Sequence, residues 1–213
     1  MNSLLLYYIT ARKQFPGAEQ ERRERLLDNI CEALRSGVDY IQLREKDLSG
    51  RELECLGREV AQMIRASGSK TQLLINSRTD IALAVGADGV HLRASDISPK
   101  DVRTIWREAN GAKDPVVAVS CHTEAEVITA KQSGTDFVVF GAVFGKSERA
   151  EIHVAGLQGL RSACRHDFPV LALGGITLTN ARSCIKAGAA GVAGIRLFQE
   201  NEIENTVEQL REL

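Results

Sequence analysis

Apolar runs recur along this chain, and four of them follow the same short phrase of a small residue, a glycine, a further residue and usually an acid. The phrase occurs at Ser36–Asp39, Val85–Asp88, Ser133–Asp136 and Ala187–Ala190. Its glycines are about 50 residues apart, which suits two βα units and is too wide for a solenoid repeat. Glycine ends a helix readily because the position after the helix needs a positive φ. Each phrase therefore predicts a helix end, a loop and the start of a strand.

Four more apolar runs lie between these, so the pattern predicts eight strands. They lie near residues 4–9, 39–43, 72–75, 88–92, 116–119, 136–140, 170–173 and 191–195. Polar and amphipathic stretches between them predict helices, which are expected over 21–35, 49–66, from 98–99, from 123–126, over 177–187 and over 198–213. Ser49 followed by Glu52 has the spacing of a capping box at the start of one of them.

Strict alternation of apolar strands with helices indicates a parallel sheet that is covered on both faces. Recurrence of one phrase around the chain favours closure, because every strand then has an equivalent environment. No Gly-x-Gly-x-x-Gly phrase follows the first strand, which disfavours a dinucleotide-binding fold. The sequence therefore predicts one domain, residues 1–213, with an α/β fold: a (β/α)8 TIM barrel.

Composition narrows the possible partners. The chain has 213 residues, 44% hydrophobic and 26% charged, with a formal net charge of −1, so we expect neither nucleic-acid nor membrane-surface binding. No apolar stretch reaches the length of about 20 residues that spans a bilayer, and residues 1–6 have no basic region typical of a signal peptide. Five cysteines without a CxxC pair indicate reduced thiols and a cytoplasmic protein. A small-molecule substrate is expected, and a homo-oligomer stays possible.

Polar residues gather where the predicted strands end, which is where barrel enzymes place their active sites. Alternation in an extended backbone turns Gln42, Arg44 and Lys46 to one side of the second strand end. The other candidates follow later strands: Asn76, Arg78, Asp96, Ser120 and His122. Arg44, Lys46 and Arg78 are candidates for binding an anionic group, and His122 is the best candidate for acid–base chemistry because imidazole titrates near neutrality.

The last two strand ends predict a phosphate site. Barrels often hold phosphate with backbone N–H groups of the loops after strands 7 and 8. Gly174, Gly175 and Gly194 allow close approach of the backbone, and Ile195 and Arg196 continue the same edge. Relief of crowding in the barrel wall is the alternative explanation for these glycines.

Several strand-end phrases together resemble the thiamine-phosphate synthase/TenI family. They are Gln42–Lys46, Ile75–Ala82, Gly86–Leu92, Ser120–His122, Phe140–Phe144 and Ala172–Ile176. The resemblance covers nearly the whole chain in order. It implies a barrel that handles a thiazole phosphate in vitamin B1 synthesis.

The resemblance implies two possible branches. Synthases of the family join a pyrimidine diphosphate to thiazole phosphate and expel pyrophosphate with Mg²⁺, which two aspartates hold. Here Asp96 matches the second acid and Ser77 replaces the first, while Arg149 is the candidate for a lysine expected after strand 6. Arg196 and Leu197 stand where a small Ser-Ala pair is expected.

TenI-type members resemble the chain more closely at these positions. They lack the acid of the third strand, and the resemblance implies that a histidine matching His122 moves a proton between thiazole tautomers without a metal. We therefore expect a thiazole tautomerase with His122 and Arg44 as catalytic residues and no cofactor. The alternative is a divergent Mg²⁺-dependent synthase that binds the metal through Asp96. A non-catalytic thiazole-phosphate binder is the third hypothesis.

Overall fold

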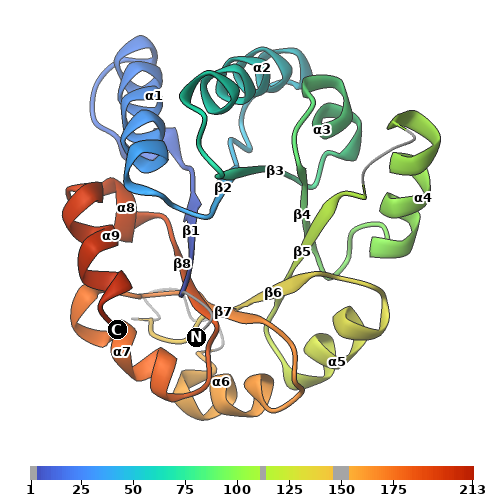
Figure 1. The fold of residues 1–213 in the computed structure, drawn as a ribbon, viewed down its shortest axis with the longest axis vertical. Helices are drawn as coiled ribbons and strands as arrows, with labels where there is room; N and C mark the ends of the chain where they lie inside the picture. The colour runs from blue at the N-terminus through green and yellow to red at the C-terminus, as the bar shows by residue number, and fades with distance from the viewer. Residues whose placement is uncertain (1–3, 111–113, 146–153) are drawn as a thin grey trace.

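The computed structural model describes residues 4–110, 114–145 and 154–213. Eight parallel strands close into a barrel in the order β1 to β8, and the predicted (β/α)8 architecture is confirmed. The strands are β1 Leu5–Ile9, β2 Tyr40–Leu43, β3 Gln72–Asn76, β4 Gly89–Arg93, β5 Val116–Cys121, β6 Phe137–Phe140, β7 Val170–Ala172 and β8 Gly191–Gly194. Figure 1 shows helices arranged around these strands.

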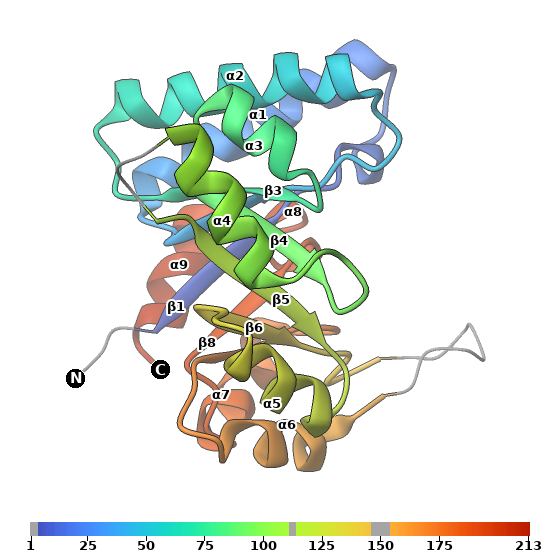
Figure 2. The same ribbon diagram turned by 90° about the vertical axis from the view of Figure 1, so that its right-hand side faces the viewer.

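The helices alternate with the strands. They are α1 Glu19–Ser36, α2 Gly50–Ser67, α3 Thr79–Val85, α4 Pro99–Asn110, α5 Glu124–Gln132, α6 Gly156–Cys164, α7 Leu178–Lys186, α8 Arg196–Gln199 and α9 Ile203–Arg211, with a 3-10 turn η1 at Arg12–Gln14. In the view at right angles, α1 to α3 lie on one side of the obliquely crossing strands and α5 to α7 on the other (Figure 2).

Most predicted element bounds lie within a residue or two of those in the structure. The capping box is confirmed: the Ser49 N–H donates to Glu52 Oε2 at 2.8 Å, and Ser49 Oγ accepts from the Glu52 N–H. The single helix predicted over 198–213 is wrong, because α8 ends at Gln199 and α9 begins at Ile203. The break occurs because the Ile203 N–H donates to Glu32 of α1, which fixes where α9 starts.

The repeated phrase has a structural role that the sequence shows only in part. All four of its glycines have a positive φ, as predicted for residues that end helices. Its acids make a second contact. Asp39, Asp88 and Asp136 each accept a hydrogen bond from the backbone N–H of the preceding strand, at Leu6, Leu73 and Val117. The same strand residues accept hydrogen bonds from the backbone N–H groups of these acids. The fourth phrase has Ala190 and keeps only the backbone bond, to Val170.

Two layers of apolar side chains form the core. The barrel interior holds a small cluster that includes Tyr7, Leu74, Phe137 and Leu171, with the rings of Tyr7 and Phe137 edge to face at 5.7 Å. A larger cluster packs the outer face of the strands against the helices. The interior layer fills the barrel below the site.

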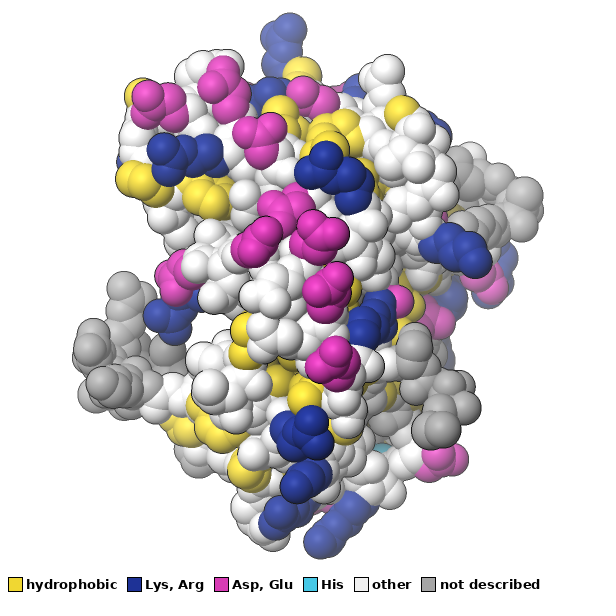
Figure 3. All heavy atoms as spheres, turned by 60° about the vertical axis from the view of Figure 1, so that its left-hand side comes forward, with side chains coloured by type: hydrophobic (Ala, Val, Ile, Leu, Met, Phe, Trp, Pro, Cys, Tyr) yellow, Lys and Arg dark blue, Asp and Glu magenta, His cyan; other side chains and the backbone are white. Residues whose placement is uncertain are grey.

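Charged side chains of both signs lie over the face shown in Figure 3, and neither sign covers it alone. This distribution agrees with the net charge of −1. None of the described helices is both long enough and apolar enough to span a membrane.

We expect Asp136→Ala to lower the free energy of unfolding by about 2 kcal/mol, because it removes a charged acceptor from the Val117 N–H. It also leaves Arg103, which donates to the same carboxylate at 2.8 Å, without that partner. Urea denaturation measures the change. Asp114→Ala, in an exposed ion pair with Arg107, is the control and should cost less than about 0.5 kcal/mol. Equal effects of the two substitutions would contradict this role of the repeated acid.

Candidate functional site

Three adjoining cavities occupy the mouth formed by the C-terminal strand ends. The central cavity, of about 490 Å³, shares Lys46, Asn76 and Arg93 with a cavity of about 310 Å³ on the β2–β4 side. It shares Leu173 and Ile195 with a cavity of about 640 Å³ at β7 and β8. The three spaces therefore adjoin one another across the mouth of the barrel.

The central cavity brings together residues predicted from different strands. Gln42, Arg44 and Lys46 all line it, as the alternation along the second strand predicts. Asn76, Ser120, His122 and Ile195 line it as well. The structure thus places seven of the fourteen predicted site residues around one space.

A buried chain of hydrogen bonds crosses the floor of the central cavity. Gln42 Nε2 donates to Tyr7 Oη at 3.1 Å, and Tyr7 Oη lies 2.9 Å from His91 Nδ1. Because this nitrogen is the acceptor within reach of the tyrosine proton among the described residues, His91 carries its own proton on Nε2. That proton is donated to Ser120 Oγ at 2.7 Å. The hydroxyl proton of Ser120 is left for a ligand in the cavity.

His91 is neutral in this arrangement. Burial lowers the pKa of its imidazole to about 3, and the nearby Arg44 guanidinium acts in the same direction. A neutral imidazole can accept from Tyr7 and donate to Ser120 at the same time, whereas a protonated ring could only donate. The directionality of the chain therefore depends on burial of His91.

His122 lies at the rim, exposed, with one ring nitrogen committed. Its Nδ1 contacts the Gly141 carbonyl, which can only accept, so the proton is on Nδ1. In the neutral ring Nε2 is then free to accept a proton, and His122 lines the central cavity. The backbone N–H of His122 donates to the Glu126 side chain, which holds the segment between β5 and α5 against the first turn of α5. This geometry is compatible with the predicted acid–base role.

The tip of β2 is held by a buried ion pair. Glu45, 4% exposed, accepts from Thr10 Oγ1 at 2.6 Å and from Arg12 Nη1 at 3.0 Å. Arg12 also binds Asp47, and hydrogen bonds from the guanidinium hold the pKa of the Asp47 carboxyl well below its usual range. Thr10 accepts from the Arg44 N–H at 2.9 Å. Glu45 thus lines the β2–β4 cavity but not the central one, which Arg44 and Lys46 line.

The cavity-lining cations of β2 carry excess positive charge. Neither Arg44 nor Lys46 forms an ion pair with a carboxylate among the described residues. The positive charge of Arg44 lowers the pKa of Lys46, and burial and the charge of Arg93 lower it further. These like charges therefore lie close to one another. Anions are therefore favoured in this part of the site.

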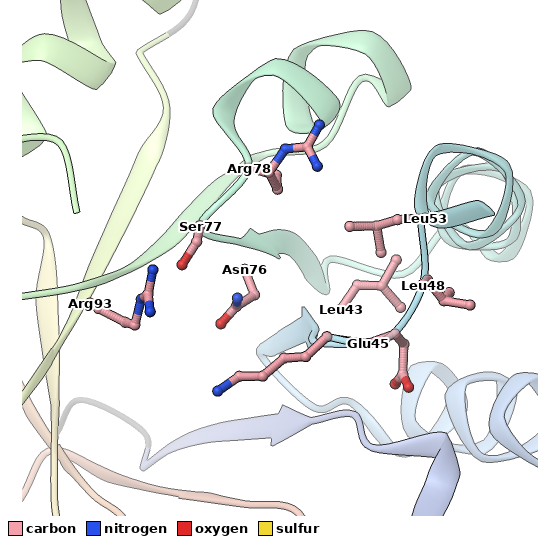
Figure 4. Close-up of a pocket in the computed structure, with 9 residues that line it drawn as sticks. Leu43, Glu45, Leu48, Leu53, Asn76, Ser77, Arg78 and Arg93 are labelled. Atoms are coloured by element: carbon pink, nitrogen blue, oxygen red, sulfur yellow. The ribbon is translucent and has the colours of Figure 1, made fainter. Parts of the chain in front are cut away.

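Ser77 and Arg93 enclose the carboxylate of Asp96. Figure 4 shows Asn76, Ser77 and Arg93 turned toward the same space. Ser77 Oγ donates to Asp96 Oδ2 at 2.6 Å, and the Arg93 N–H donates to the same oxygen at 2.8 Å. The Arg93 guanidinium binds Asp96 Oδ1 at 2.9 Å. Burial opposes ionisation of Asp96, but these donors outweigh it and lower the pKa of the carboxyl.

The resemblance implies Mg²⁺ for a synthase, and the donor set here does not fit it. A carboxylate offers about four acceptor positions, and Asp96 accepts hydrogen bonds from Ser77 Oγ, the Arg93 backbone N–H and Arg93 Nε. Arg93 Nη2 lies 2.9 Å from the same Oδ1 as an ion pair. No group of three or more metal-ligating His, Cys, Asp or Glu side chains occurs in the part of the chain that the structure describes. A positive guanidinium occupies the space beside the only matching acid.

Two predicted anion-binding arginines have different outcomes. Arg78 lines the β2–β4 cavity, but its guanidinium binds Asp80 at 2.6 Å and points away from the centre (Figure 4). Arg149 lies outside the described residues. Arg78 is therefore a weaker anion ligand than its sequence position indicates.

The cavity at β7 and β8 contains the predicted phosphate residues. It is lined by Gly174, Gly175, Gly194, Ile195 and Arg196, with Arg196 exposed at its edge. Gly174 and Gly175 both have a positive φ, and a Cβ on Gly175 would lie 2.4 Å from the Phe144 carbonyl oxygen. Crowding against the loop after β6 is thus one reason for glycine at these two positions. Close approach of a ligand is the other explanation, and the two are compatible. The four-residue α8 begins beside this cavity, and no side chain caps its first turn.

Sequence reasoning missed three residues that shape the site: Tyr7, Glu45 as a buried brace, and Arg93. Tyr7 lies in the first predicted strand, but nothing local indicated its partner His91, 84 residues away. Arg93 follows His91 by two positions on β4, and this spacing is the signal that places it at the mouth.

Comparisons with known proteins show the family to which the chain belongs. The sequence profile of a family described as thiamine monophosphate synthase matches residues 6–198. A putative thiamine-phosphate synthase 2 of Aquifex aeolicus is 38% identical over 196 residues, 92% of this chain and 97% of that protein. The thiamine-phosphate synthase of Pyrococcus furiosus is 32% identical and is aligned over 100% of this chain and 95% of its own length.

Solved structures give the same relationship. A structure titled thiamine phosphate pyrophosphorylase from Pyrococcus furiosus superposes with a TM-score of 0.79 at 31% identity, covering 99% of this chain and 95% of that one. A 3-hexulose-6-phosphate synthase superposes with a TM-score of 0.68 at 18% identity, which shows a shared fold alone.

The buried state of His91 predicts a pH dependence of stability. The folded pKa of about 3 lies below the ordinary value, so the unfolded chain binds a proton that the folded chain does not. Above about pH 6.5 His91 does not lower the free energy of unfolding. Below it, His91 lowers the free energy of unfolding by about 1.4 kcal/mol per pH unit, until the pH reaches the pKa of His91 in the folded protein. Urea denaturation between pH 6.5 and 4 should show this slope, and His91→Asn should remove it. Ser120→Ala keeps the buried imidazole and should retain the slope; loss of the slope in both variants would contradict the assignment.

Glu45→Gln should destabilise the fold by about 3 kcal/mol, because it leaves the buried Arg12 guanidinium without one of its charged partners. Thermal or urea unfolding measures the change. Glu54→Gln removes an exposed pair with Arg58 one helical turn away, and should change stability by less than about 0.5 kcal/mol. A Glu45→Gln protein as stable as this control would show that the pair does not hold the β2 tip.

Proposed function

Because the chain belongs to the thiamine monophosphate synthase family, we propose that it joins a pyrimidine diphosphate to a thiazole phosphate and releases pyrophosphate. The observation that carries the proposal is a row of adjoining cavities across the mouth, with candidate anion-binding groups at each end. Arg44 and Lys46 supply positive charge at one end. The glycine-lined β7–β8 cavity, with Arg196 at its edge, supplies backbone donors at the other.

The reaction makes one bond and breaks one. A bond forms between the thiazole ring nitrogen and the carbon that carries the diphosphate, and the bond from that carbon to the diphosphate oxygen breaks. The electron pair of the broken bond leaves with pyrophosphate. Negative charge therefore develops at the diphosphate, where preorganised cations are most effective.

The described side chains fit this reaction by position. The β7–β8 cavity would bind the phosphate of the thiazole, and the space shared at Leu173 and Ile195 would hold its ring. The Ser120 hydroxyl, aimed by the His91 chain, would orient the pyrimidine. Arg44 and Lys46 would bind the diphosphate, and Glu45 would keep both in place by holding the β2 tip. Holding both substrates in one site is a large part of catalysis for such a step.

The relatives named as synthases support a transferase over the tautomerase that Ser77 led us to expect. His122 stays the candidate proton carrier of a tautomerase, since its Nε2 is free. In a transferase it has no proton to move from a reacting carbon. His122 therefore separates the two activities experimentally.

Purified protein incubated with both substrates should form thiamine phosphate and pyrophosphate, measured in one arm with Mg²⁺ and in another with EDTA. Product in either arm supports the transferase. Lys46→Gln should lower kcat/KM about 10- to 100-fold, because it removes a charged hydrogen bond to the leaving group. His122→Ala should retain most of the activity.

Other outcomes assign other functions. No product in either arm, together with His122-dependent isomerisation of a thiazole carboxylate phosphate, would replace the transferase with a tautomerase. Binding of thiazole phosphate without turnover in either assay would leave a binding protein.

A further inference from the structure

Arg93 lies in the space where the proposed reaction would release pyrophosphate, an anion that positive charge stabilises. It lines both the central cavity and the β2–β4 cavity, beside Lys46 and Asn76. Its Nε and one terminal nitrogen bind Asp96, which fixes the plane of the guanidinium. A guanidinium has five N–H donors, so the others stay available to an anion in the shared space.

Asp96 is committed to orienting Arg93. The Ser77 hydroxyl and the Arg93 backbone N–H hold one carboxylate oxygen, and the guanidinium holds the other. With serine in place of an acid at residue 77, the cluster contains one negative and one positive side chain. A second carboxylate, which a bound divalent cation would offset, is absent from this cluster of described residues.

Three cations therefore face the same space: Arg44, Lys46 and Arg93. Among the described residues, Asp96 is the acid that pairs with one of these cations, and the Glu45 carboxylate is bound to Arg12. The lowered pKa of Lys46, caused by Arg44 and then burial and Arg93, agrees with crowding of like charges. A polyanion such as a diphosphate would relieve this repulsion.

We propose that the juxtaposition of Arg44, Lys46 and the Asp96-oriented Arg93 forms a diphosphate site that binds its ligand without a divalent metal. Since it concerns the leaving group of the proposed transferase, this inference rests on that function. Arg93 supplies the positive charge that a metal would otherwise bring to the departing diphosphate, and its fixed plane suits two-point contact with phosphate oxygens. Ser77 is the residue that makes this possible. Its hydroxyl donates a hydrogen bond to the Asp96 carboxylate, whereas an acid at this position would add a second negative charge beside it.

Calorimetric titration of inorganic pyrophosphate into the intact protein tests the proposal without any turnover. The wild-type chain should bind pyrophosphate in EDTA, and adding Mg²⁺ should change the Kd by less than about threefold. Binding that needs Mg²⁺, or is strengthened tenfold by it, would overturn the proposal, as would no binding under either condition. This measurement requires no variant, so it does not depend on the folding of one.

Two substitutions locate the site. Arg93→Gln should weaken metal-free binding about 10- to 100-fold, the range for lost charged hydrogen bonds. Unchanged binding in this variant would place pyrophosphate elsewhere and overturn the proposal. Arg107→Gln, which removes an exposed arginine of α4 paired with Asp114, is the matched control and should bind as the wild type does.

Ser77→Asp tests the role of the serine by gain of metal dependence. Residue 77 has a φ of +56°, a conformation that aspartate tolerates, so the backbone accommodates the change. The new carboxylate lies beside Asp96 and repels it, and Mg²⁺ should then strengthen pyrophosphate binding at least tenfold. A Ser77→Asp protein that stays indifferent to Mg²⁺ would contradict the role of Ser77.

The outcomes for the inference and for the proposed function are separable. Metal-dependent binding overturns the inference and leaves the transferase intact. Metal-free binding with no product in the two-substrate assay leaves the anion site and removes the transferase.

Discussion

The hydrogen bond between a strand-start carboxylate and the backbone of the preceding strand is the constraint on which the rest of the structure depends. Asp39, Asp88 and Asp136 each bind the N–H of a neighbouring strand residue that in turn accepts from the backbone of the acid. These paired bonds set the stagger of one strand against the next at the N-terminal end of the barrel. The three strands that follow these acids have only four or five residues. The stagger therefore influences which of their side chains meet at the opposite, C-terminal mouth.

Burial of polar groups inside the barrel then determines how the mouth presents its chemistry. The chain from Gln42 through Tyr7 and His91 to Ser120 satisfies four buried or part-buried polar groups and leaves one hydroxyl proton directed outward. The Arg12–Glu45 pair acts similarly at the tip of β2: it binds the acid outside the central cavity, which Arg44 and Lys46 line. In both cases, buried polar groups bind one another and leave specific polar groups facing the central cavity.

The fold and most of the site follow from local patterns. Glycine and acid recur before each strand because helix ends need a positive φ, and alternation along β2 sends Gln42, Arg44 and Lys46 to one cavity. The family resemblance on the strand-end phrases was confirmed by the profile that matches residues 6–198. The division of the last helix into α8 and α9 was missed because the contact that fixes it, between Ile203 and Glu32, joins segments 171 residues apart.

The amino-acid sequence by itself determined the eight strands, the barrel, the ring of polar strand ends and the family, because each depends on periodicity or on residues close together in the chain. Only the tertiary structure decided the partners of those polar residues. Asp96 matched a metal ligand in the sequence, yet in space its oxygens are taken by Ser77 and Arg93. The physical reason is that a carboxylate binds whichever donors folding brings within about 3 Å of it, and sequence spacing does not specify which donors those are.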